Sequence, residues 1–186
     1  MLVEAIEGSP RDLESIGLLC VAHEILWPYT RQTIKDLKNI SQTMQVARQA
    51  NPISNYAQTC QISYLMSKGQ IREAKALTEK TLDSGSSEKF ILSPFLYLIK
   101  AEILEYELNF ANSAAYYDQA IKLWPQWSWA RLGLARMWLK QNNYLQARNE
   151  FQSILSANNE SKAALYGLGL TELKGFNNPE KSYQFF

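Results

Sequence analysis

The sequence predicts an all-α protein built from about nine to ten helices that pair as antiparallel hairpins. Proline and glycine are scarce, with 6 and 8 copies in 186 residues, and they lie between segments rich in helix-favouring residues. Apolar residues within the segments recur at helical spacing, and no long stretch alternates as a strand would. The turns between segments also repeat at a fixed interval. A fixed interval of helical pairs is typical of a repeat array.

The first 52 residues are predicted to form a helical pair that continues or caps the array. Ser9 followed by proline supplies an N-cap and a first-turn proline for the first helix, which a Trp-Pro pair ends. Thr30 starts a longer helix, and Asn51 followed by proline stops it. The register of this pair within the array stays open.

Residues 53–186 are predicted to form four hairpins, the last of them truncated, at about 53–86, 93–126, 127–160 and 161–186. Ser54 is expected to cap the first of these helices, and Ser93 followed by proline repeats the cap seen at Ser9. The two helices of each hairpin are expected to meet at a short turn. The four turns are placed at Gly69, Leu108–Asn109, Asn142–Asn143 and Gly175.

Two adjacent turns and their second helices superpose at an interval of about 34 residues, which is called one repeat length below. Ser113 aligns with Ala147, and Tyr117 aligns with Phe151. The segment KQNNYLQARNEFQSIL, with a small residue four positions before an aromatic one, resembles the second helix of the tetratricopeptide repeat. The preceding helix supplies the matching first-helix positions of that repeat: Leu134, Ala135 and Trp138.

The resemblance covers residues 53–186 and weakens toward the N-terminus. The last unit has the Leu-Gly pair at Leu168 and Gly169, and its small and aromatic positions fall at Ser182 and Phe186 if one residue is inserted at the turn. The earliest unit has Gly69 and Ala74, but Thr78 stands in place of the aromatic residue. Other departures from the repeat pattern occur at Lys100, Ser113 and Asn159. The resemblance implies a right-handed superhelix whose first helices line a concave surface. It also implies a non-enzymatic scaffold that binds another protein or a peptide.

A narrower resemblance concerns WPQWSWARLGLARMWLKQNNYLQARNEFQSILSANN, which is similar to the repeat segment that follows the receiver domain in some bacterial two-component response regulators. It implies an output or regulatory module that acts on a signalling partner. This sequence carries no receiver domain of its own. The response-regulator module is therefore kept as an alternative function.

Composition argues against several other classes of function. Lys plus Arg number 19 and Asp plus Glu 18, so no net positive field would gather the phosphates of a nucleic acid. No apolar run is long enough to cross a bilayer, and the first residues do not resemble a signal peptide. No phosphate-binding loop or nucleophile elbow occurs. We therefore expect a cytoplasmic protein that is not an enzyme and takes no cofactor, nucleic acid or membrane.

The two cysteines, Cys20 and Cys60, are far apart and not in a Cys-x-x-Cys pair. We expect buried free thiols, in agreement with a reducing compartment, although a disulfide stays an alternative. His23 lies near Cys20, but two ligands do not make a zinc site. We therefore predict no metal.

The repeat register gives a candidate groove along the first helices that is apolar and aromatic with charges at its margins. Its residues are Tyr56, Met66, Phe95, Leu98, Glu102, Tyr106, Trp129, Leu132, Arg136, Lys140, Tyr166, Leu170 and Lys174. For Trp129, groove contact and core packing stay open, whereas Trp138 is expected to pack between hairpins. Glu102 and Glu105 are expected on an exposed face. The Lys/Asn clamp that some relatives use for a terminal carboxylate is absent.

Self-association is a third interpretation. The sequence ends at Phe185 and Phe186, inside an expected helix and without a polar helix to cover its last apolar face. Either the natural protein continues beyond this point, or that face is a contact between copies.

Overall fold

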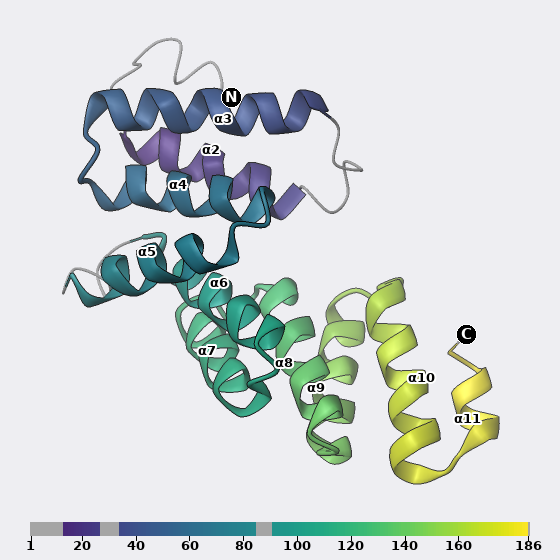
Figure 1. Ribbon diagram of the computed structural model, residues 1–186. Helices are drawn as coiled ribbons and strands as arrows, with labels where there is room; N and C mark the ends of the chain where they lie inside the picture. Colours follow the sequence, from purple (N-terminus) through teal and green to yellow (C-terminus); the bar gives the residue numbers. More distant parts are fainter. Residues whose placement is uncertain (1–12, 27–33, 85–90, 186) are drawn as a thin grey trace. The chain divides into compact units, whose positions relative to one another are not determined.

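A computed structural model describes residues 13–26, 34–84 and 91–185, and within these ranges every regular element is a helix (Figure 1). The helices are α2 Leu13–Leu26, α3 Ile34–Ala50, α4 Asn55–Ser67, α5 Ile71–Asp83, α6 Ser93–Tyr106, α7 Phe110–Leu123, α8 Ser128–Lys140, α9 Tyr144–Ala157, α10 Lys162–Phe176 and α11 Pro179–Tyr183. The predicted all-α class is confirmed. The predicted helix starts at Ser9 and Thr30 lie outside the described residues.

The chain forms two compact units, residues 1–96 and 97–186, and the boundary between them falls within α6. This division differs from the predicted organisation into residues 1–52 and four hairpins. The hairpin boundaries stay predictions, since a compact unit can hold more than one hairpin.

In the first unit, helices α2, α3 and α4 pack on one another (Figure 1). Their shared core includes Ile16, Met44 and Ala57, all buried. The predicted cap at Ser54 is confirmed, because its side chain accepts a hydrogen bond from the Ala57 backbone N–H at 3.1 Å.

The predicted cap at Ser93 is wrong. The first helical hydrogen bonds of α6 run from the backbone N–H groups of Phe95 and Leu96 to the carbonyl of Leu92, which makes Leu92 the cap position. Ser93 therefore lies one residue inside the helix, where its side chain is buried.

Cys20 of α2 and Cys60 of α4 form a disulfide, with their Cα atoms 5.1 Å apart. The expectation of free thiols is therefore wrong. Both residues are fully buried in the core of the first unit, so helix packing brings together two cysteines that are 40 residues apart in sequence. The thiol-based argument for a reducing compartment therefore no longer holds.

The hairpin turns of the second unit repeat in the structure as predicted. Leu108 and Asn142, one repeat length apart, both adopt a left-handed backbone with φ 61°. The third turn residue of this kind is Asn177, with φ 49°, and α10 continues through the predicted turn at Gly175. The interval from Asn142 to Asn177 is one residue longer than that from Leu108 to Asn142, which confirms the expected single insertion.

Glycine allows two second helices, α7 and α9, to approach the next first helix closely. A Cβ atom at Gly133 of α8 would overlap the ring of Tyr117 of α7. One repeat length later, a Cβ atom at Gly167 of α10 would overlap the ring of Phe151 of α9. Tyr117 and Phe151, 0% and 1% exposed, are therefore the plugs between neighbouring hairpins that the repeat predicts.

The serines at the small position of the repeat, the departure Ser113 and the matching Ser182, also have a structural reason. Ser113 donates its hydroxyl hydrogen bond to the carbonyl of Ala101 across its hairpin at 2.8 Å, and Ser182 does the same to Gly169 at 2.9 Å. Both bonds are buried, so the serine hydroxyl joins the two helices where alanine would only make contact. Phe186, the expected aromatic of the last unit, lies outside the described residues.

Candidate functional site

The candidate site lies on the first helices of the second unit, α6, α8 and α10. Because the turns and the glycine contacts repeat, positions on α8 have equivalents one repeat length away on α6 and α10. The space between α6 and α8 holds Glu102, Glu105, Trp129 and Arg136 of this chain and is called the filled groove below. The equivalent space between α8 and α10 is called the open groove.

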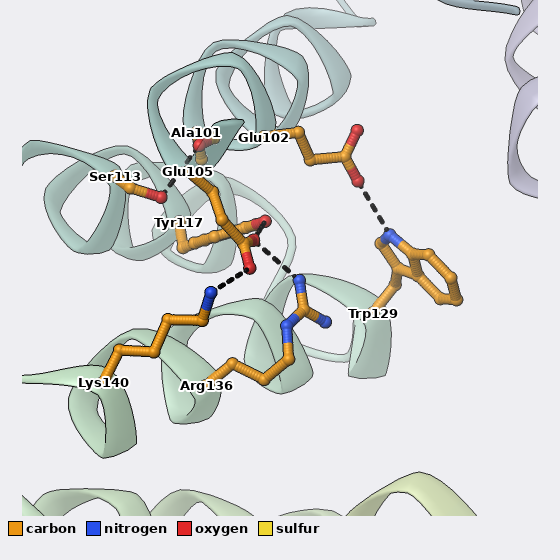
Figure 2. A network of polar contacts seen from close by, with 8 residues as sticks. All are labelled: Ala101, Glu102, Glu105, Ser113, Tyr117, Trp129, Arg136 and Lys140. Carbon is orange, nitrogen blue, oxygen red and sulfur yellow. Dashed lines mark hydrogen bonds and ion pairs between the residues drawn. The ribbon is translucent and has the colours of Figure 1, made fainter. Parts of the chain in front are cut away.

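Trp129 closes one part of the filled groove. Its indole Nε1 donates a hydrogen bond to Oε1 of Glu102 at 3.1 Å, which joins α8 to α6 (Figure 2). The Trp129 side chain is half-buried. The sequence left open whether Trp129 packs in the core or contacts a partner in the groove. In the structure, the ring does neither of these alone, because it bridges the two first helices α6 and α8 through its hydrogen bond to Glu102.

Glu105 is the centre of the remaining contacts in the filled groove (Figure 2). Its Oε2 accepts hydrogen bonds from Arg136 at 2.8 Å and from the Tyr117 hydroxyl at 3.1 Å. Its Oε1 lies 3.7 Å from Nζ of Lys140. The Glu105 side chain is only 19% exposed, whereas those of Arg136 and Lys140 are 45% and 44% exposed. The carboxylate of Glu105 therefore pairs with both Arg136 and Lys140 while these two side chains stay partly exposed.

Burial raises the pKa of Glu102 above its ordinary value, while the Trp129 hydrogen bond and the nearby Arg136 lower it in part. Burial, and then the charge of Glu102, also raises the pKa of Tyr117, which stays a neutral hydrogen-bond donor. The expectation that Glu102 and Glu105 lie on an exposed face is therefore wrong, because both are partly covered by α8.

The open groove contains a cavity of about 410 Å³, within the range typical of ligand pockets. Residues from α8, α9 and α10 line it: Leu132, Arg136, Leu139, Lys140, Phe151, Ala163, Tyr166, Gly167, Leu170 and Lys174. The wall is mainly apolar, with three cationic side chains. No carboxylate is among these lining residues, and the described residues provide no ion pair to Lys174.

Two substitutions between equivalent positions explain why one groove is filled and the other is open. Ala163 of α10 stands where α8 has Trp129, so a methyl group replaces the indole ring. Leu139 of α8 stands where α6 has Glu105, so an apolar side chain replaces the central carboxylate. The backbone arrangement repeats, and the difference lies in the side chains.

Six of the predicted groove residues line this cavity together: Leu132, Arg136, Lys140, Tyr166, Leu170 and Lys174. Glu102 and Trp129 bond to each other in the filled groove. Phe95 and Leu98 are 1% and 2% exposed, which corrects their assignment to a contact surface. Tyr106 is 73% exposed and lies outside the cavity lining.

Tyr56 and Met66, also predicted for the groove, lie on α4 in the first unit and are half-buried there. The cavity is lined only by residues of the second unit. We therefore build the site from the second unit alone.

Sequence reasoning missed Glu105, Leu139 and Ala163 as site residues. A repeat-by-repeat comparison of first-helix positions would have found them, because each breaks the pattern set by its equivalent in the adjacent repeat. A search for large or charged side chains does not select an alanine.

A second charged cluster fixes the end of the second unit. Glu172 of α10 is fully buried, and its carboxylate lies 2.8 Å from Arg148 of α9 and 3.1 Å from Lys181 of α11. The guanidinium carbon of Arg148 also lies 3.3 Å from the ring centre of Phe176. These contacts hold three helices together and leave Glu172 inaccessible to a partner.

The hairpins, plug residues and repeating turns of the second unit are those of a helical repeat of the tetratricopeptide type. Residues 107–170 match the family described as tetratricopeptide repeat. The resemblance is thereby confirmed, and this segment consists of tetratricopeptide repeats. No curated protein matches the chain.

Solved structures agree on the fold. YrrB, described as a TPR protein with an unusual peptide-binding site, is 17% identical, with 100% of this chain and 88% of that chain covered and a TM-score of 0.63. The type IV pilus biogenesis factor PilW is 17% identical, with 99% and 79% covered and a TM-score of 0.70. A chain of the Cut9–Hcn1 hetero-tetramer of APC/C is 16% identical, with 98% of this chain and 33% of that chain covered and a TM-score of 0.75. The fold is thus that of a tetratricopeptide solenoid.

The response-regulator module, self-association and cytoplasmic location stay predictions, because none of these comparisons bears on them. Within the described ranges, no helix is both long enough and apolar enough to cross a membrane.

Proposed function

We propose that the chain is a non-enzymatic scaffold that holds a peptide or a segment of another protein in the open groove. The single observation that carries this proposal is the apolar cavity of about 410 Å³ between α8 and α10, with three cations at its wall. Apolar anchors provide most of the affinity in such sites, and charges at the margin select the partner.

The comparisons support the same class of function. The family of residues 107–170 generally serves in protein interactions, and the YrrB structure is described as having a peptide-binding site. Six residues that line the cavity were also predicted from the repeat register, independently of its volume.

A displayed library of random peptides, enriched on the immobilised chain, tests the proposal. We expect the enriched peptides to lose at least tenfold in affinity for Tyr166→Ala and Lys174→Glu, since both side chains line the cavity. Trp129 and Arg136 are less suitable targets, because their bonds to Glu102 and Glu105 hold the filled groove together.

The matched controls change the same residue types outside the cavity. Lys162→Glu reverses a charge in the first turn of α10, and Tyr183→Ala removes an exposed ring from α11. Both controls should bind the enriched peptides as the unchanged chain does. Equal affinity of groove and control variants for every enriched peptide would contradict the proposal.

A further inference from the structure

The filled groove shows which chemistry this backbone arrangement accommodates. Between α6 and α8, the chain itself supplies a large aromatic ring, Trp129, and a carboxylate, Glu105, that engages Arg136 and Lys140. These side chains occupy the space that is empty one repeat later. In the filled groove, side chains of the chain itself therefore take the place that a bound partner would take in the open groove.

The open groove lacks the ring. Ala163 occupies the position of Trp129, and Leu132, Phe151 and Leu170 are among the residues that line the cavity with it. Phe151 is 1% exposed, and its ring packs so closely against Gly167 that a Cβ atom there would overlap it. An aromatic side chain from outside would bury its faces on these apolar walls.

The open groove also lacks the carboxylate. Leu139 occupies the position of Glu105, and Lys174 occupies that of Lys140. Lys140 has a carboxylate at 3.7 Å, whereas the described residues place no acidic partner beside Lys174. Arg136 and Lys140 are nearly half-exposed even though Glu105 engages them. The mainly apolar wall of the cavity therefore carries three cations, which are complementary to a negative charge.

We propose that the open groove takes an acidic peptide segment, in which a large aromatic side chain fills the space left by Ala163 and an adjacent carboxylate pairs with Lys174. This inference rests on the proposed function and specifies the chemistry of the partner. The occupant supplies to the open groove what Trp129 and Glu105 supply to the filled one.

A nucleic acid is the competing class of anionic partner. Only three cations line the cavity and its wall is mainly apolar, whereas a nucleic acid brings a row of phosphates that needs many cations. The chain as a whole carries 19 basic and 18 acidic residues. Charge and apolarity together favour the acidic peptide.

Four short peptides with blocked ends and a fluorescent label test the proposal by fluorescence anisotropy with the full chain. The first has a central tryptophan flanked by glutamates, and the others replace the tryptophan by alanine, the glutamates by lysines, or both. We expect the glutamate–tryptophan peptide to bind about tenfold tighter than any of the other three. A labelled oligoadenylate of similar length is the nucleic-acid arm.

Filling the cavity from within should remove this binding. Ala163→Trp installs the ring seen at Trp129, and Leu139→Glu installs the carboxylate seen at Glu105, which would then pair with Lys174. Each should weaken the glutamate–tryptophan peptide at least tenfold. Ala115→Trp, at an exposed position of α7 outside the cavity, is the matched control and should not.

Lys174→Glu keeps the test independent of whether Ala163→Trp folds. This reversal on an exposed side chain should weaken the glutamate–tryptophan peptide and strengthen the lysine–tryptophan peptide, so that the preference between them changes sign.

The proposal is overturned if none of the four peptides binds, if the lysine or alanine peptides bind as tightly as the glutamate–tryptophan peptide, or if oligoadenylate binds more tightly. The proposed function would still stand after any of these outcomes if library peptides of another composition bind the chain and lose affinity for Tyr166→Ala and Lys174→Glu. Absence of any groove-dependent library peptide contradicts the proposed function itself.

Discussion

Both units of the chain have close glycine–aromatic contacts between helices, such as Gly17 with Tyr56 in the first, but among the described residues only the first unit has a disulfide. In the first unit, a disulfide between Cys20 and Cys60 joins α2 to α4 inside the core. In the second unit, the described residues contain no cysteine, and adjacent hairpins join through glycine–aromatic contacts such as Gly133 with Tyr117. The covalent bond occurs where the repeat signature is weak, and the repeated contact where the signature is strong.

The position equivalent to Tyr117 illustrates the difference. In the first unit it is Thr78, which is fully buried and donates its hydroxyl hydrogen bond to the carbonyl of Ala74 on its own helix. Threonine buries much less apolar surface than an aromatic plug does. Thr78 of α5 therefore contributes less packing than its aromatic equivalents, and the disulfide between α2 and α4 is a separate source of stability in the first unit.

The largest expected effect is that of Cys20→Ser. Opening a loop of 40 residues should lower the free energy of unfolding of the first unit by about 4 kcal/mol, since the unfolded chain regains conformational freedom. Hydrogen exchange measured by mass spectrometry should show faster exchange in α2 and α4 and little change in α8 and α9. A reductant should act in the same way on the unchanged chain and leave Cys20→Ser unaffected. Uniform loss of protection in both units would contradict the comparison.

The matching change in the second unit is Gly133→Val. The added side chain overlaps the ring of Tyr117, which is fully buried, so we expect a loss of about 3 kcal/mol in the free energy of unfolding. Urea denaturation followed by circular dichroism measures it. Ala115→Val places the same side chain at an exposed position of α7 and should cost less than about 1 kcal/mol. Equal costs would show that the glycine contact is not tight.

Ser113→Ala should have a smaller effect, a loss of about 1 kcal/mol, because it removes the buried hydrogen bond to Ala101. Alanine is already present at the equivalent Ala147, so the substitution leaves the packing of the repeat intact. The same urea titration measures the loss, and Ser153→Ala, at an exposed position of α9, is its control. An unchanged midpoint would mean that the hydroxyl does not join the two helices.

The smallest effect is expected from Glu102→Gln. Burial raises the pKa of Glu102, so the Glu102 carboxyl binds its proton more tightly in the folded chain than in the unfolded chain. At a pH above the ordinary pKa of 4.5, the charged carboxylate therefore lowers the stability of the fold. The amide should therefore raise the melting temperature at pH 7 while it still accepts the Trp129 hydrogen bond. The gain should shrink as the pH falls through the raised pKa and vanish below the ordinary one.

Melting curves of Glu102→Gln between pH 4 and pH 8 provide the measurement. Glu160→Gln, at an exposed position outside the grooves, is the control and should change the curves little at any pH. A melting temperature of Glu102→Gln that is lower than that of the unchanged chain at pH 7 would contradict the expected sign.

Much of the fold was predictable because it follows from local signals. The turns at Leu108 and Asn142 were found from the residues that interrupt the helical pattern, and their spacing of one repeat length agrees with a repeated backbone. The last turn was placed two residues early, at Gly175 in place of Asn177, because asparagine also adopts the left-handed conformation that glycine favours. The disulfide was not predictable, since only helix packing brings Cys20 near Cys60.

The candidate site was predictable only in part. Lining residues such as Tyr166 and Lys174 follow from the register, because side chains on one helical face lie in a row. The role of Glu105 does not, since its burial depends on how α8 covers α6. The depth of the cavity depends on Ala163, and a small side chain gives no signal in a search for anchors.

The contrast between Trp129 and Ala163 bears on how such arrays change over time. A ring at one position and a methyl group at its equivalent separate an occupied recess from an empty one on the same backbone. The number of recesses in the array is therefore independent of the number of its repeats. A few nucleotide changes at the two codons that distinguish the grooves would erase such a recess or create one, without altering the length of the chain.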